Sequence, residues 1–122
     1  RSDGSPQRDF IHISDICNAI ETIINSDNKT LHNNTIHISS GETLTIMELA
    51  KAVGREYKKR YNYDIPILLP DKVSDIFALE SSKKQKYTID NSLLKSLGVT
   101  PKMSIAGGLN ELFDYIERSN DR

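Results

Sequence analysis

Apolar residues recur at helical spacing in three stretches of the chain, which predicts three amphipathic helices. The first stretch covers residues 16–24, the second begins near residue 45, and the third follows Ser104. The apolar positions are, in order, Ile16, Cys17, Ile20, Ile23 and Ile24; Ile46, Leu49, Ala50, Val53 and Tyr57; and Ile105, Leu109, Leu112, Phe113 and Ile116. Each set lies on one face of a helix, so each helix is expected to pack by that face.

Polar residues mark where these helices start. Ser14 or Asp15 is expected to cap the first helix and Ser104 the last. Thr45 and Glu48 have the spacing of a capping box, in which two side chains accept hydrogen bonds from unpaired backbone N–H groups. Asp90 is expected to cap a further short helix that carries leucines 93, 94 and 97 and ends at Gly98.

Short β-rich or alternating runs separate the helices and predict strands at residues 10–13, 35–39 and 65–69, with an extended run at 87–89. Pro66 and Pro70 restrict the third strand to a sheet edge. The pattern over residues 71–86 is weak. Since 122 residues are enough for one core, the chain is predicted to be a single unit of mixed α/β class, residues 1–122.

The charge and the cysteine content of the chain argue against several classes of function. Charged residues make up 27% of the chain and the net charge is -1, which argues against a general attraction to nucleic acid or to a membrane surface. Cys17 is the only cysteine, so the chain builds no internal disulfide and no cysteine-based zinc site, as fits a cytoplasmic protein. Cys17 itself is expected to be a small buried apolar side chain.

Several kinds of site are missing from the sequence. The six glycines form neither G-x-G-x-x-G nor a P-loop, so the chain has no cradle for a dinucleotide. Histidines 12, 32 and 37 lack the helical spacing of a metal pair, and we predict no metal site. His12, Ser14 and Asp15 are the residue types of a hydrolytic triad, but the serine and the aspartate are explained as helix caps.

Two local features suit an anion. Gln7 and Arg8 come directly before a predicted strand, and an anchored guanidinium can hold a phosphate through two parallel hydrogen bonds. The alternative is a surface arginine paired with Asp3 or Asp9. The second feature is the basic run at residues 81–86, which is most often a solvated loop.

Residues 4–16, Gly-Ser-Pro-Gln-Arg-Asp-Phe-Ile-His-Ile-Ser-Asp-Ile, resemble the segment that opens the C-terminal half of the extended short-chain dehydrogenases. These are the NAD-dependent nucleotide-sugar epimerases, dehydratases and ketoreductases. Residues 36–50 are similar to that family's next strand, turn and helix, and residues 87–109 to its closing helices. The resemblance implies the C-terminal substrate-binding part of a longer enzyme, with elements that would complete a Rossmann-type sheet and an absent N-terminal NAD-binding domain.

The resemblance also implies roles for named residues. Arg8, with Gln7 beside it, would contact the diphosphate of a nucleotide sugar. The family's second arginine falls at Glu80, so Lys83 or Lys86 would have to replace it. No tyrosine has a lysine four places on, so the family's catalytic Tyr-x-x-x-Lys pair is not in this chain. The chain is therefore expected to be inactive alone, with NAD or NADP bound by the absent half of the full-length enzyme.

Two further hypotheses are kept. Residues 45–60 also look like the first helix and turn of a helix-turn-helix DNA-binding domain, with Lys58, Lys59 and Arg60 facing phosphates. Alternatively, the chain is a noncatalytic binding or assembly module. As the severed half of an enzyme it would expose apolar helix and strand faces, so a homo-oligomer is expected. The sequence does not determine the sugar, the nucleotide or the type of reaction.

Overall fold

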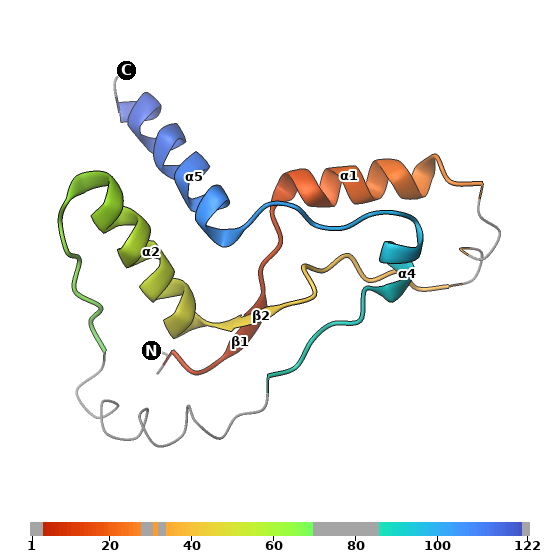
Figure 1. The fold of residues 1–122 in the computed structure, drawn as a ribbon, viewed down its shortest axis with the longest axis horizontal. Helices are drawn as coiled ribbons and strands as arrows, with labels where there is room; N and C mark the ends of the chain where they lie inside the picture. Colours follow the sequence, from red (N-terminus) through yellow and green to blue (C-terminus); the bar gives the residue numbers. More distant parts are fainter. Residues whose placement is uncertain (1–3, 28–30, 32–33, 70–85, 121–122) are drawn as a thin grey trace. The chain divides into compact units, whose positions relative to one another are not determined.

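A computed structural model describes residues 4–27, 31, 34–69 and 86–120 of this chain (Figure 1). Its elements are β1 (Gln7–Asp9), α1 (Ile13–Ile24), β2 (Thr43–Thr45), α2 (Ile46–Tyr61), α4 (Ser92–Ser96) and α5 (Ile105–Asn120). β1 and β2 pair in a two-stranded sheet. The mixed α/β class is confirmed.

The chain divides into two compact units, where a single unit was predicted. One comprises Arg1–Arg8, Leu44–Lys86 and Ile105–Arg122, and the other comprises Asp9–Thr43 and Tyr87–Ser104. Each unit is assembled from segments far apart in the sequence, so its core depends on contacts that no local pattern contains.

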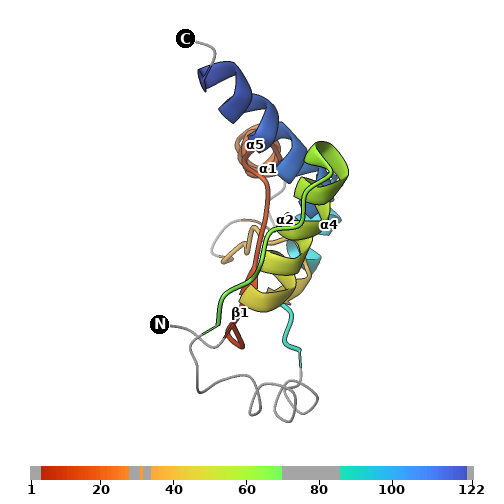
Figure 2. The same ribbon diagram turned by 90° about the vertical axis from the view of Figure 1, so that its left-hand side faces the viewer.

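The first unit is built on α2 and α5, which pack against each other (Figure 2). α2 starts at the predicted capping box: the Glu48 N–H donates to Thr45 Oγ1 over 3.0 Å, and the Thr45 N–H donates to Glu48 Oε2 over 2.7 Å. It ends where Asn62 turns to the left-handed conformation at φ 52°. Phe113 on α5 is buried, and its ring centroid lies 6.1 Å from those of Tyr57 and Tyr61 on α2.

The second unit has its core beneath α1. Ala19, Leu94 and Val99 are buried there, and the partly buried Ile23, Ile36, Ile38 and Leu97 pack around them. Ile36 and Ile38 therefore face this core from one side of their segment. α4 carries Leu94 into this core and is followed by Gly98 at φ 79°.

Two carboxylates, the buried Asp15 and the half-buried Asp9, connect segments of the second unit. Asp15 on α1 accepts hydrogen bonds from the backbone N–H groups of Lys102 (3.1 Å) and Met103 (3.0 Å). Asp9 accepts in the same way from Ser40 (2.8 Å) and Gly41 (3.3 Å). Both carboxylates thus satisfy backbone donors of loops that have no regular hydrogen-bond ladder.

The strands of the structure differ from those that the sequence predicts. The first paired segment is Gln7–Asp9 rather than 10–13, and residues 35–39 and 65–69 form no strand. Residues 65 and 67–68 have apolar side chains that are exposed, and Pro66 has no N–H to donate to a ladder. Apolar alternation indicates which side of a segment is buried, but a strand also requires a neighbouring strand.

Two predictions about α1 are wrong. Its N-cap is His12, whose ring accepts from the Ser14 N–H, while the predicted cap Asp15 is buried and bonded elsewhere. Cys17 is exposed. In the described part of the second unit, the core covers the side of α1 that carries Ala19 and Ile23, and Cys17 projects about half a turn away from it.

Candidate functional site

Arg8, the main candidate for phosphate contact, is an exposed side chain on an anchored strand. The Ile46 N–H donates to the Pro6 carbonyl and the Met47 N–H to the Gly4 carbonyl, each over 3.0 Å, which holds the start of β1 against the first turn of α2. The neighbouring Gln7 is buried, so Arg8 points to the opposite side of the strand. The structure thus places a guanidinium on a fixed backbone.

The Arg8 guanidinium keeps most of its donors available. Nη1 donates to the Gln7 carbonyl over 2.7 Å, and Arg8 makes no ion pair with any residue that the structure describes. Asp9 gives its oxygens to Ser40 and Gly41, which argues against an Arg8–Asp9 pair. Asp3 lies outside the described residues.

Of the two lysines singled out with Arg8, Lys86 lies in the same unit. Its Nζ is 3.1 Å from Glu48 Oε1, and both side chains are substantially exposed. The Thr45 N–H and Lys86 both stabilise the charged form of Glu48, so its pKa is lowered. An exposed ion pair of this kind contributes little to the stability of the protein, so Lys86 can leave Glu48 and bind another anion at low cost. Lys83 and Glu80 fall outside the described residues.

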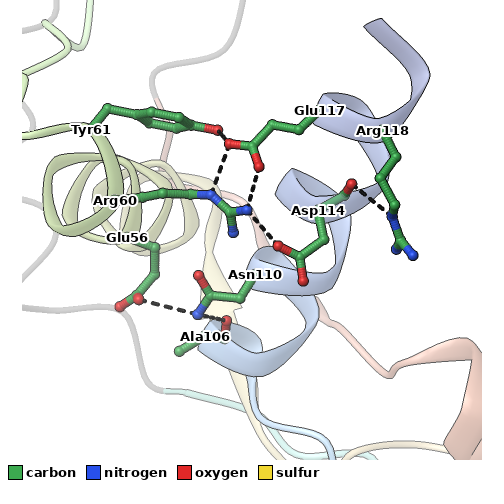
Figure 3. Close-up of polar contacts among 8 residues, drawn as sticks. All are labelled: Glu56, Arg60, Tyr61, Ala106, Asn110, Asp114, Glu117 and Arg118. Carbon is green, nitrogen blue, oxygen red and sulfur yellow. Dashed lines mark hydrogen bonds and ion pairs between the residues drawn. The ribbon is translucent and has the colours of Figure 1, made fainter. Parts of the chain in front are cut away.

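A polar cluster between α2 and α5 was not foreseen (Figure 3). Arg60 donates to Glu117 through Nε (3.0 Å) and Nη2 (2.5 Å), and it also contacts Asp114. Tyr61 Oη donates to Glu117 over 2.6 Å. The hydrogen bonds from Arg60 lower the pKa of Glu117, and the bond to Glu117 raises the pKa of Tyr61.

These contacts are structural. Asp114 and Glu117 are spaced three apart on α5 and so share a face, which was the only sequence signal for the cluster. The arginine that meets them is 54 and 57 residues away in sequence. The spacing of acidic residues in the sequence indicates which of them share a helix face, but not which helix packs against that face.

The helix-turn-helix hypothesis has no support in the structure. α2 runs without a break from Ile46 to Tyr61 and passes through Gly54, where the turn would be needed. The three cations that would face phosphates are already engaged: Lys58 with Asp64, Lys59 with Glu56, and Arg60 with Glu117 and Asp114. Residues 45–60 are therefore one continuous helix preceded by its cap.

The residue types of a triad do not form one. His12 Nδ1 is 2.7 Å from Ser14 Oγ, but the Asp15 carboxylate is bonded to the backbone of residues 102 and 103. Among the described residues, no group of three or more histidine, cysteine, aspartate or glutamate side chains is placed to hold a metal ion. No helix in the described ranges is both long and apolar enough to cross a membrane.

The glycines do not form a dinucleotide cradle. Gly4, Gly41 and Gly98 have positive φ, as a phosphate-binding turn often requires. A Cβ at Gly4 would lie 3.1 Å from Met47 Cβ, and one at Gly41 would lie 2.9 Å from the amide of Asn91. These glycines are close to the protein's own side chains, and Gly98 follows a helix of five residues. The positive-φ glycines of the described residues therefore offer no cradle for the phosphates of NAD.

Comparison with known proteins gives relatives of consistent type. GDP-L-fucose synthase 1 of Arabidopsis thaliana is 32% identical over 116 residues, covering 92% of this chain and 30% of that protein. Probable GDP-L-fucose synthase 1 of Oryza sativa subsp. japonica is 27% identical over 119 residues, covering 93% and 31%. dTDP-glucose 4,6-dehydratase of Streptomyces niveus is 25% identical over 114 residues, covering 93% and 30%.

These matches confirm the resemblance to the extended short-chain dehydrogenases of nucleotide-sugar metabolism, and they cover nearly the whole chain. The chain spans about 30% of the length of these curated relatives. No family model matches it. No solved structure matches it either.

Proposed function

We propose that this chain is the nucleotide-sugar-binding part of an NAD-dependent epimerase, dehydratase or reductase, and that it is inactive on its own. The observation that carries the proposal is the similarity to two kinds of enzyme named for nucleotide sugars, a GDP-L-fucose synthase and a dTDP-glucose 4,6-dehydratase. Both names contain a nucleoside diphosphate linked to a sugar. The two kinds of nucleotide sugar therefore share a diphosphate group, and a protein binds such a group through cationic side chains.

Arg8 is proposed as the principal contact to that diphosphate. It is exposed, carried by an anchored strand, and free of ion pairs within the described residues. Its planar guanidinium has five N–H donors, of which one is used by the Gln7 carbonyl, so two parallel bonds to phosphate oxygens remain available. Gln7 is buried next to Arg8 on the same strand, and we propose that it helps to hold the backbone of Arg8 in place.

Lys86 is proposed as a second contact, since its bond to Glu48 is exposed and readily exchanged. Lys83 is proposed on sequence grounds alone. The relatives are about three times as long as this chain, and the positive-φ glycines of the described residues offer no cradle for a dinucleotide. NAD or NADP is therefore proposed to bind an N-terminal domain outside this sequence.

Self-association through α1 and a cytoplasmic location are also proposed. Ile13 is 65% exposed, Ile20 45% and Ile24 76%, and these side chains lie on one side of α1 together with the exposed Cys17. An apolar face of this kind favours contact with another protein surface, here a second copy. The single cysteine fits a reducing compartment.

Calorimetric titration of the 122-residue chain with GDP-L-fucose and with dTDP-glucose tests the proposal. We expect binding of at least one of them and none of NAD. Arg8→Ala should weaken that binding by about 1.5–3 kcal/mol, the range for hydrogen bonds to charged groups. The matched control is Arg118→Ala, because Arg118 is exposed and its Nε donates to the carbonyl of Asp114 on its own helix.

The proposal fails if neither nucleotide sugar binds at about 1 mM, which corresponds to roughly 4 kcal/mol of affinity. The role of Arg8 fails separately if binding occurs but Arg8→Ala leaves the affinity unchanged. Saturable binding of NAD by this chain would contradict the assignment of the cofactor to another domain.

A further inference from the structure

A cavity of about 310 Å³ lies within the first unit, between β2, the first three turns of α2 and the start of α5. This volume is at the lower end of the range for small-molecule sites. Its apolar lining comes from Leu44, Ala52, Ile105 and Ala106. None of these residues belongs to the proposed diphosphate contacts.

Two cations at this cavity have no hydrogen-bonded or ion-paired partner among the described residues. Lys51 and Arg55 line it, are exposed, and make no hydrogen bond or ion pair with any residue in the described ranges. They are four residues apart, so they lie on one helix face, where like charges repel each other by about 0.2–0.5 kcal/mol. The cations of the last turn of α2 are all paired, so Lys51 and Arg55 differ from their neighbours.

The two carboxylates that also line the cavity are neutralised from outside it. Glu48 is bonded to Thr45 and Lys86, and Glu56 is bonded to Lys59 and Asn110. Hydrogen bonds to these partners lower the pKa values of both glutamates, with a smaller contribution to Glu56 from the charge of Arg55, so both carboxylates are ionised and each has a lysine partner outside the cavity. Lys51 and Arg55 thus give this site a net positive charge.

The start of α5 adds to this positive character. Ile105 and Ala106 are the first two residues of a helix of 16 residues, so their N–H groups lie at its positive end. The cavity therefore combines an apolar lining, two side-chain cations and a helix N-terminus. This combination suits a molecule with one anionic end and one apolar end.

We propose that this cavity binds a small phosphate monoester that carries an apolar or aromatic group, with the phosphate held by Lys51 and Arg55. The apolar group then lies against Leu44 and Ala52. The site is separate from Arg8 and goes beyond the proposed nucleotide-sugar function, so either can fail without the other.

Titration of the ¹⁵N-labelled 122-residue chain with phenyl phosphate, followed by NMR, tests this proposal. We expect saturable shifts of the amide signals of Lys51, Arg55, Ile105 and Ala106. Inorganic phosphate should bind more weakly because it lacks the apolar group, and phenol should bind more weakly because it lacks the charge. The same spectra report whether each variant is folded.

The double variant Lys51→Ala/Arg55→Ala should lower the affinity for phenyl phosphate by about tenfold or more, since it removes two charged hydrogen-bond donors. The matched control is Lys58→Ala/Arg118→Ala, which removes the same charge from the first unit at positions that neither line the cavity nor pair with a residue that lines it. It should bind normally. An equal loss in both double variants, or no saturable shift at about 10 mM ligand, would overturn the proposal.

Discussion

Replacing Asp15 by alanine should destabilise the second unit more than any substitution of an exposed acid on α1. Asp15 is 7% exposed, and its two oxygens accept the N–H groups of Lys102 and Met103 at 3.1 and 3.0 Å. These bonds connect α1 with a segment that lies 87 and 88 residues further along the chain. Alanine leaves both backbone donors without their acceptor.

The size of the effect follows from these two bonds. A hydrogen bond to a charged group contributes about 1.5–3 kcal/mol, which gives roughly 3–6 kcal/mol as an upper bound. Lys102 is exposed and Met103 half-buried, so water can reach at least one of the freed N–H groups. We therefore expect a loss of about 2–3 kcal/mol for Asp15→Ala, and about 1 kcal/mol for Asp15→Asn, which keeps one acceptor oxygen.

Urea unfolding followed by far-ultraviolet circular dichroism measures this loss. With a slope of about 1–2 kcal/mol per molar urea, the midpoint should fall by roughly 1–3 M for Asp15→Ala. Glu21→Ala is the control, because Glu21 is an exposed acid on the same helix and should change stability by less than about 0.5 kcal/mol. If Asp15→Ala and Glu21→Ala have the same midpoint, the carboxylate does not hold this segment in solution.

Three further predictions concern the other described contacts. Arg60 lowers the pKa of Glu117 from its ordinary value of 4.5, so their pairing stabilises the protein fully above pH 4.5 and is lost as the pH falls through the lower pKa of the folded state. Glu117→Gln should therefore make the free energy of unfolding depend less on pH in the acid range. An unchanged dependence would refute the pairing. Cys17 is exposed, so Ellman's reagent should modify the folded protein rapidly and with one equivalent at about 5 μM, where a self-association contact of roughly 5.5 kcal/mol is mostly dissociated; slow modification that requires urea at this concentration would show that the chain itself covers the thiol. Self-association through α1 should appear in sedimentation equilibrium at about 100 μM, a concentration near the dissociation constant of a contact of roughly 5.5 kcal/mol. Ile20→Asp should abolish it, because Ile20 is exposed on the proposed contact face. A strictly monomeric parent chain contradicts the proposed contact.

Local features of the sequence determined the helices well. The capping box at Thr45 and Glu48 forms with both of its hydrogen bonds, and α5 begins directly after Ser104. The N-cap of α4 is Asn91 rather than the predicted Asp90, but Asp90 still accepts from the Ser92 N–H over 2.9 Å, which lowers the pKa of Asp90. Caps and helical periodicity involve residues within about four positions of each other, so the sequence alone contains their energetics.

The candidate site was predictable only in part. Arg8 and Lys86 were predicted from the sequence, and the structure describes the surroundings of both. Arg8 lies on an anchored strand, and Lys86 forms an exposed pair with Glu48. Their role in binding stays a prediction. The bond between Lys86 and Glu48 spans 38 residues, and nothing in the local pattern of either residue indicates the other.

Tertiary structure alone decided which polar groups are buried and which apolar groups are not. Asp15 has the sequence features of a helix cap, yet it is buried because loop N–H groups from the end of the second unit need an acceptor. Cys17 and Ile20 have the periodicity of a buried face, yet they are exposed. Periodicity fixes which side chains share a side of a helix, whereas burial depends on what packs against that side, and those segments are distant in sequence.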